Sequence, residues 1–231
     1  MWEPQLALAE CGWRILAPQL RGMGSGGSDP PATSMDDYAG DAIDLLDALH
    51  IEQAVVGGLS MGGYVAFAMF RHAPRYVRGL VLADTRPQAD APETVEARKR
   101  MLALLRDKGP VAVAEDMMPR LFGSTTHRER PELADTVRRL ISANSVDAIA
   151  GAITALMTRP DSTTVLGSIH CPTLVLVGEE DAITPVKLSE EMQQAVAGAE
   201  LAIIPRAGHL SNLEQPDGFN AALERFLNHR V

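Results

Sequence analysis

Short apolar runs alternate along the chain with longer segments in which apolar residues recur every three or four positions. The short runs predict strands, and they are Arg14–Ala17, Ala54–Gly57, Val77–Ala83, Thr173–Val177 and Glu200–Ile204. The longer segments predict helices, and they are Met35–Leu49, Met61–Arg71, Pro185–Ala197 and Pro216–Asn228. Strands that alternate with helices are typical of a parallel sheet with helices on both faces. The pattern therefore predicts an α/β fold.

This alternation stops between residues 87 and 160, where no segment has the pattern of a strand. Helical patterns fill the stretch instead, at Thr94–Lys108, Val111–Leu121, Glu132–Ala143 and Val146–Thr158. We therefore expect an α/β core built from residues 1–86 and 161–231, interrupted by an all-helical insertion at residues 87–160.

Composition and charge exclude several classes of protein. The chain has 231 residues, 46% of them hydrophobic and 22% charged, which is typical of a folded domain with a sizeable core. A net charge of −9 and an aromatic content of 4% argue against nucleic-acid binding. The longest uncharged run, Gln53–Phe70, is interrupted by glycine and polar residues, unlike a membrane span. The N-terminal residues lack the pattern of a signal peptide, which favours a cytoplasmic protein.

Cysteine and glycine patterns give no sign of a cofactor. Cys11 and Cys171 form neither a CxxC pair nor a metal-binding spacing, so two reduced thiols are the simplest interpretation. The run Gly22-x-Gly24-x-Gly26-Gly27 does not match the dinucleotide-binding fingerprint, and no phosphate-binding loop signature occurs. We therefore expect no metal and no organic cofactor.

The segment Gly58-Leu59-Ser60-Met61-Gly62 has the spacing Gly-x-Ser-x-Gly. A predicted buried strand precedes it and a predicted apolar helix follows it, which is the context of a nucleophile elbow. Such a turn strains the serine backbone, and its glycines let strand and helix pass closely. We therefore predict that Ser60 is a nucleophile at the helix N-terminus, with Gly58 and Gly62 as elbow residues. The alternative is an ordinary glycine-rich turn with an incidental serine.

A serine nucleophile needs a histidine base and a carboxylate that orients the histidine, and both are expected on loops after later strands. His209 follows the last predicted strand and is the candidate base. The remaining histidines are interpreted as surface or structural residues, and they are His50, His72, His127, His170 and His229.

Four carboxylates compete for the role of the acid. Glu179, Glu180 and Asp181 follow the fourth predicted strand, whereas Asp84 follows the strand after the elbow helix. Glu179 and Glu180 are compatible with a solvated acidic loop. We favour Asp181 as the acid and keep Asp84 as the alternative.

Beyond these single residues, five segments resemble the α/β-hydrolase fold superfamily, and in particular small bacterial esterases and lactonases of the 3-oxoadipate enol-lactonase type. The segments are LAPQLRGMGSGGSDP, VVGGLSMGGYVAFAMF, LVLADTRP, PTLVLVGEEDAITPV and AGHLSNLEQPDGF. The resemblance implies a mostly parallel sheet flanked by helices, with the helical insertion as a lid. It also implies Ser60 as nucleophile, Asp181 as acid, His209 as base and the Met61 N–H as one oxyanion donor.

Two features depart from the family pattern. Gln19 stands where family members usually carry an aspartate, a position away from the chemistry. Related chains also carry strands and a His-Gly turn ahead of the residues that match Met1–Pro4, and that turn supplies the second oxyanion donor. Arg21–Ser28 is glycine-rich but belongs to the next loop. We therefore expect a sheet truncated at its N-terminal strands and half of an oxyanion hole.

These observations lead to a serine hydrolase that cleaves a small apolar ester, lactone or thioester with water through an acyl-enzyme. One alternative is a non-catalytic or incomplete hydrolase-like protein, and another is a carbon–carbon bond hydrolase or cofactor-free haloperoxidase with the same triad. Apolar residues of the insertion either line a substrate pocket or pack the lid on the core. They are Met101, Leu104, Leu105, Met117, Met118, Leu121, Phe122, Leu156 and Met157. Oligomeric state stays open.

Overall fold

Four parallel strands form the centre of the computed structural model, which describes residues 1–24 and 30–231. They are β1 (Ala54–Leu59), β2 (Val77–Ala83), β3 (Thr173–Gly178) and β4 (Glu200–Ile204), hydrogen-bonded in that order. Leu59 pairs with Ala83, and Ala83 pairs in turn with Leu176, so the carboxyl ends of these strands lie level. The predicted α/β fold with a parallel sheet is confirmed, and the loops that carry the candidate residues leave the sheet at one edge.

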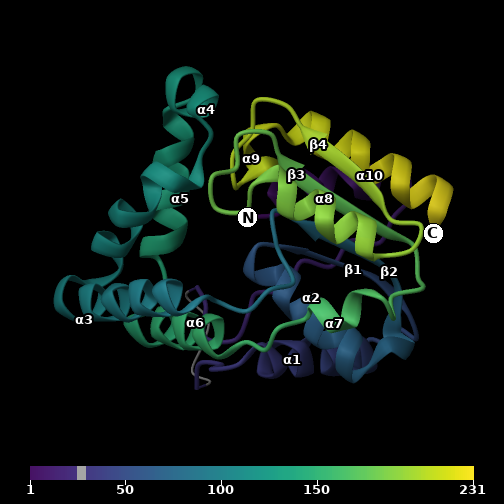
Figure 1. Cartoon of the computed structure of the whole chain (residues 1–231), viewed down its shortest axis with the longest axis horizontal. Helices are drawn as coiled ribbons and strands as arrows, with labels where there is room; N and C mark the ends of the chain where they lie inside the picture. Colours follow the sequence, from purple (N-terminus) through teal and green to yellow (C-terminus); the bar gives the residue numbers. More distant parts are fainter. Residues whose placement is uncertain (25–29) are drawn as a thin grey trace.

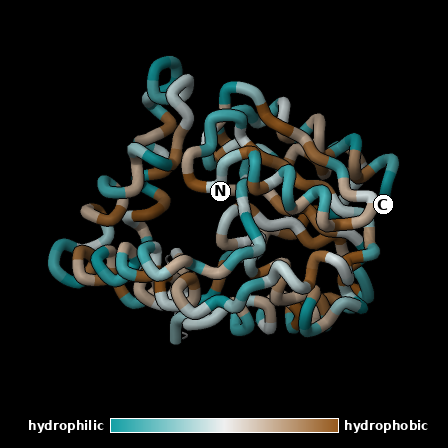
Figure 2. The backbone as a smooth tube through the Cα atoms, viewed as in Figure 1, coloured by the Kyte–Doolittle hydropathy of each residue, from teal (hydrophilic) through white to brown (hydrophobic). Residues whose placement is uncertain are grey.

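Both faces of the sheet are covered by helices (Figure 1). The long helices of the core are α1 (Met35–Ala48), α2 (Met61–His72), α8 (Val186–Ala195) and α10 (Pro216–Arg230). The face that carries Leu80 and Leu82 packs against α2 and α8. The face that carries Val81 and Leu174 packs against α10. Hydrophobic residues accordingly concentrate along the sheet (Figure 2).

Short helical turns connect the longer elements, and the sequence pattern did not predict them. They are η1 (Glu3–Cys11), η2 (Pro74–Tyr76), α7 (Thr163–Leu166) and α9 (Ser211–Glu214). Three to nine residues are too few to show a helical period reliably. The turn η1 is held by the buried Gln5, whose side chain donates hydrogen bonds to the backbone oxygen of Asn212 and to Asn220 Oδ1.

The predicted strand Arg14–Ala17 is wrong: the segment is irregular, and the Leu16 side chain is 41% exposed. A strand needs a neighbour for its backbone N–H and C=O groups. In the part of the chain that the structure describes, the only strand paired with β1 is β2, and no strand pairs with residues 14–17. Of the glycine-rich run that follows, Gly26 and Gly27 lie outside the described residues.

Residues 87–160 contain no strand, as the pattern predicts. Their helices are α3 (Pro92–Leu121), α4 (Ser124–Glu129), α5 (Glu132–Ser142) and α6 (Val146–Thr158). The two helices predicted at the start of this stretch both occur within α3, where a kink at the non-helical Gly109, with φ +76°, separates them. These helices gather beside the sheet rather than on its faces (Figure 1). A separate apolar cluster built around Leu105, Val113 and Ile153 holds α3 to α6.

The two ends of this helical stretch are tied together where they join the core. The Asp90 side chain is fully buried, and its carboxylate forms ion pairs with Arg86, Arg98 and Arg159. The Ser162 N–H also donates to the Pro87 backbone oxygen over 2.8 Å. Buried charges are stable only when they are paired and hydrogen-bonded, so these contacts define the base of the helical stretch.

Among the described residues, no single helix has the length and apolar composition to cross a membrane. The pair α5 and α6 meets these criteria together, but the two helices meet at an angle of 97°. Cys11 is an exposed free cysteine, and Cys171 is a half-buried free cysteine.

Candidate active site

Ser60 lies in the tight turn between β1 and α2, with φ 53° and ψ −112°. A positive φ is uncommon for a residue with a side chain and is sustained only where the surroundings impose it. Here the Ser60 N–H donates to the Ala83 backbone oxygen over 2.8 Å, and the Ser60 backbone oxygen accepts from Thr85 Oγ1 over 2.9 Å. Ala83 ends β2 and Thr85 follows it by two residues, so the end of the neighbouring strand and the loop after it hold the strained turn in place.

The elbow glycines do not share one role. A Cβ atom on Gly58 would lie 2.0 Å from the backbone oxygen of Gly62, a contact that no side chain tolerates. A Cβ atom on Gly62 itself would meet nothing within 4 Å. The second close approach is at Gly63, where a Cβ atom would lie 2.5 Å from the Thr85 side chain. The close passage of strand and helix predicted for Gly58 and Gly62 therefore depends on Gly58 and Gly63.

His209 reaches Ser60 from the loop after β4. Its Nε2 lies 2.8 Å from Ser60 Oγ, and its Nδ1 lies 2.8 Å from Asp181 Oδ2 on the loop after β3. The His209 ring is buried, as is the Asp181 carboxylate. Three residues from three separate loops thus form one continuous chain of hydrogen bonds, in the arrangement of a nucleophile, a base and an orienting acid.

The local loop holds Asp181 in its charged form. Its Oδ1 accepts hydrogen bonds from the N–H groups of Ile183 (2.7 Å) and Thr184 (3.0 Å), and its Oδ2 accepts from Thr184 Oγ1 (2.6 Å). Burial raises the pKa of this carboxyl, but the hydrogen bond and charge of His209 and the Thr184 donors outweigh burial, so its pKa falls below the usual value. Thr184 was not among the candidates from the sequence, although an aspartate side chain that accepts from the N–H two residues on, as Asp181 does from Ile183, is typical of an Asx-turn.

Asp84, the alternative acid, forms no hydrogen bond with His209. Its fully buried carboxylate accepts hydrogen bonds from the Gly178 N–H over 2.8 Å and from Ser211 Oγ instead. Burial is the main reason that the pKa of Asp84 is raised to about 7. The structure therefore brings Asp181, and not Asp84, to the histidine.

The remaining sequence candidates lie elsewhere. Glu179 accepts from the Arg206 N–H, and Glu180 accepts from residues of α4, so neither reaches the histidine ring. The other five histidines are all exposed, in agreement with their interpretation as surface residues, and they are His50, His72, His127, His170 and His229.

Met61 is the first residue of α2, directly after Ser60. The first N–H groups of a helix have no intrahelical acceptor and lie at the positive end of the helix dipole. The Met61 N–H therefore suits a developing negative charge beside Ser60. The resemblance assigns the second donor to a His-Gly turn, and no His-Gly pair occurs in the sequence.

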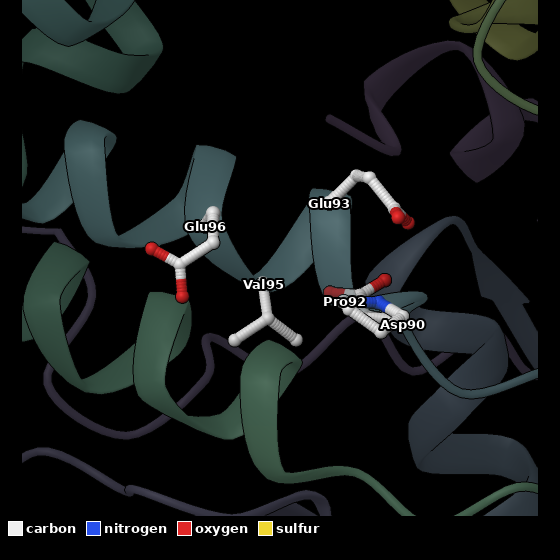
Figure 3. Close-up of a pocket in the computed structure, with 5 residues that line it drawn as sticks. All are labelled: Asp90, Pro92, Glu93, Val95 and Glu96. Carbon is white, nitrogen blue, oxygen red and sulfur yellow. The ribbon is translucent and has the colours of Figure 1, made fainter.

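A surface depression of about 390 Å³ lies at the start of α3, away from this site. It is lined by Asp90, Pro92, Glu93, Val95 and Glu96 (Figure 3). The Glu93 and Glu96 side chains point away from each other in Figure 3, and Asp90 is already paired with three arginines. The carboxylates that line this depression therefore do not converge on a ligand. Across the described residues, no group of three or more His, Cys, Asp or Glu side chains is arranged to hold a metal ion.

Comparison with known proteins identifies the family of this chain. The family model described as "Alpha/beta hydrolase family" matches residues 1–222. The chain is 28% identical over 224 residues to 3-oxoadipate enol-lactonase 2 of Acinetobacter baylyi, covering 97% of this chain and 82% of the relative.

Solved structures give the same result. A thermophilic esterase from Thermogutta terrifontis with malate bound superposes with a TM-score of 0.94 at 38% identity, covering 98% of this chain and 84% of that one. The enol-lactonase from Burkholderia xenovorans LB400 superposes with a TM-score of 0.89 at 27% identity, covering 99% and 86% respectively. The fold, the elbow and the family match converge: this chain belongs to the alpha/beta hydrolase family.

Proposed function

We propose that this protein is a serine hydrolase that cleaves a small carboxylic ester, lactone or thioester, with Ser60, His209 and Asp181 as its triad. The observation that carries the proposal is the continuous chain of hydrogen bonds from Ser60 Oγ through the His209 ring to Asp181, with both links at 2.8 Å. The names of the similar proteins, an enol-lactonase and an esterase, support the same class of substrate.

The reaction follows from the positions of these atoms. Ser60 Oγ attacks the carbonyl carbon of the substrate while its proton passes to His209 Nε2. The charged imidazole is stabilised by the ionised Asp181 and gives the proton to the leaving oxygen or sulfur as that bond breaks. Water then attacks the acyl-enzyme, with His209 Nε2 taking its proton and returning it to Ser60. The products are an acid and an alcohol or thiol, or a hydroxy acid from a lactone. The Met61 N–H stabilises the oxyanion at both tetrahedral stages.

A fluorophosphonate probe tests this assignment, because it reacts covalently only with an activated serine. We expect labelling of Ser60 in the parent protein and hydrolysis of short p-nitrophenyl esters, lactones or thioesters. Ser60→Ala should abolish both, and Asp181→Asn should lower kcat by roughly 10⁴-fold, as the same change does in a serine-protease triad. Ser168→Ala, at an exposed serine, is the matched control.

The outcomes separate the alternatives. An unlabelled Ser60 in folded protein, together with no effect of Ser60→Ala, would show a non-catalytic member of the fold. Labelling of Ser60 without ester, lactone or thioester hydrolysis, but with turnover of a vinylogous diketone or of a halide and peroxide, would point to the carbon–carbon bond or haloperoxidase chemistry that shares this triad.

We propose further that residues 87–160 act as a lid whose half-buried methionines contribute to the acyl pocket. Met117 packs against both the core cluster and the cluster between α3 and α6, which supports a position between lid and core. Met117→Trp should therefore reduce kcat/KM for a butyrate ester more than for an acetate ester. An equal reduction for both esters would contradict a role in the acyl pocket.

A further inference from the structure

Two carboxylates, close in the sequence to Asp181 and His209 respectively, reach the same short segment of the helical stretch. Glu180 directly precedes Asp181, and Glu214 follows His209 by five residues. Both side chains bind the segment Gly123–Thr126, where α3 ends and α4 begins. The loop of the acid and the loop of the base therefore share one docking point outside the core.

Glu214 links this segment to the histidine loop. Its side chain is fully buried, and its Oε2 accepts hydrogen bonds from the Gly123 N–H (2.8 Å) and from Thr126 Oγ1 (2.7 Å). Its Oε1 accepts from the N–H of Leu210 over 3.1 Å. Leu210 is the residue after His209, so the carboxylate connects the helical stretch to the backbone that carries the base. A buried carboxylate is stable only with such a full set of donors.

Glu180 makes the corresponding link to the acid loop. Its carboxylate accepts hydrogen bonds from the Thr125 N–H over 2.8 Å, from Thr125 Oγ1 and from Ser124 Oγ over 3.0 Å. Burial raises the pKa of this carboxyl, but the donors of Thr125 and Ser124 outweigh burial and hold the pKa below its usual value. The Glu180 N–H also donates to the Ala207 backbone oxygen over 2.7 Å, which connects the acid loop directly to the base loop.

The backbones of the three segments pack directly against one another. A Cβ atom on Gly208 would lie 2.2 Å from the Gly123 nitrogen, and a Cβ atom on Gly178 would lie 2.1 Å from the Gly208 oxygen. These backbones are in direct contact with no side chain between them. A displacement of the segment at Gly123 is therefore transmitted to the backbone beside His209 rather than absorbed by side chains.

We propose that Glu180 and Glu214 are positioning residues that clamp the acid loop and the base loop onto Gly123–Thr126, and so keep Asp181 and His209 aligned with Ser60. This inference rests on the proposed function. The clamp acts on the alignment of the triad and not on substrate binding. Its loss should therefore lower kcat by roughly 10²-fold, the effect of a displacement of about 1 Å at the reacting atoms, while KM changes much less.

The test uses Glu214→Gln and Glu180→Gln in the whole protein, with Glu190→Gln at an exposed position of α8 as the matched control. Each glutamine keeps the shape of the side chain but replaces one acceptor oxygen with an NH₂ group that faces a donor. Thr126→Val removes one bond of the clamp from the opposite side and serves if Glu214→Gln does not fold. All rates are measured well below each variant's melting temperature, so that the whole sample is folded.

Two readouts separate this inference from the proposed function: the rate of fluorophosphonate labelling at Ser60, and kcat and KM on a short ester. We expect slower labelling and lower kcat at nearly constant KM in the clamp variants, and parental values in the control. Parental labelling and kcat in folded Glu214→Gln, Glu180→Gln and Thr126→Val would overturn the clamp and leave the hydrolase assignment intact. A parent protein that is not labelled at Ser60 would overturn both.

Discussion

Replacement of the buried Asp84 by asparagine should stabilise the protein, and the gain should grow as the pH rises. Burial raises the pKa of Asp84 from the ordinary value of 3.8 to about 7. Between these two values the folded state holds a proton that the unfolded state has released. The free energy of unfolding therefore decreases as the pH rises through this window. Each pKa unit corresponds to 1.36 kcal/mol, so the total loss is about 4 kcal/mol.

Asparagine fits the same hydrogen-bond geometry without a charge. Its Oδ1 can accept from the Gly178 N–H as the aspartate does, and its NH₂ group can donate to Ser211 Oγ in place of the bond that Ser211 now donates. Asp84→Asn therefore removes the pH-dependent loss and leaves the surrounding contacts in place. Of the total, about 3 kcal/mol should develop between pH 5 and pH 8 as a difference between variant and parent.

Urea unfolding at pH 5, 6, 7 and 8, followed by tryptophan fluorescence, measures this difference. Asp44→Asn, at an exposed position of α1, controls for the removal of one carboxylate from a protein of net charge −9. A difference between Asp84→Asn and the parent that stays constant from pH 5 to pH 8, or that shrinks, would refute the reasoning. A constant difference would show that Asp84 titrates in the folded protein as it does in the unfolded chain.

Four further substitutions test backbone packing, a buried ion pair and an apolar cluster at other positions. Gly58→Ala should destabilise the protein by about 1–3 kcal/mol or more, because the new Cβ atom would meet the Gly62 backbone. Gly62→Ala should be tolerated, because its Cβ atom would meet nothing within 4 Å. Equal melting temperatures for the two variants would contradict this. Asp90→Asn leaves Arg159 buried without its counter-charge, and a loss of about 3–5 kcal/mol is expected in denaturant unfolding. Leu105→Ala should cost about 2–5 kcal/mol, since the side chain is fully buried between α3 and α6, and a cost well below 1 kcal/mol would show that this cluster is loosely packed.

Much of the fold was predictable where a periodic pattern and its packing agree. The bounds predicted for β2, β4 and α6 match the structure, and in β2 and α6 most apolar residues are buried at the spacing of a strand or a helix. The convergence of Ser60, Asp181 and His209 was predictable for a topological reason. In a parallel sheet, all carboxyl ends meet at one edge, so residues at positions 60, 181 and 209 converge although they are far apart in the sequence.

What the sequence did not reveal depends on partners that only the folded chain provides. Arg14–Ala17 has the composition of a strand, but a strand forms only beside another strand. The separate roles of Gly58 and Gly62 depend on what lies opposite each one, because a Cβ atom on Gly58 would meet the Gly62 backbone whereas one on Gly62 would meet nothing within 4 Å. The sequence pattern makes Glu180 compatible with a solvated loop and gives no interpretation of Glu214, and their hydrogen bonds exist only because Gly123–Thr126 lies against them in the folded chain.

The contacts of Asp181 and Asp84 show how local hydrogen-bond donors set the pKa of a buried carboxyl. Both carboxylates are buried and both follow a strand of the same sheet, so burial and topology do not distinguish them. Asp181 begins a turn whose own N–H groups, at Ile183 and Thr184, point back at its side chain and favour the charged form. Asp84 receives one N–H and one hydroxyl, which do not balance its burial. The environment thus separates the pKa values of two neighbouring carboxyls, as acid–base sites require. Because the donors that favour Asp181 lie within three residues of it, a turn-forming aspartate after a buried strand is a signal that sequence analysis can use.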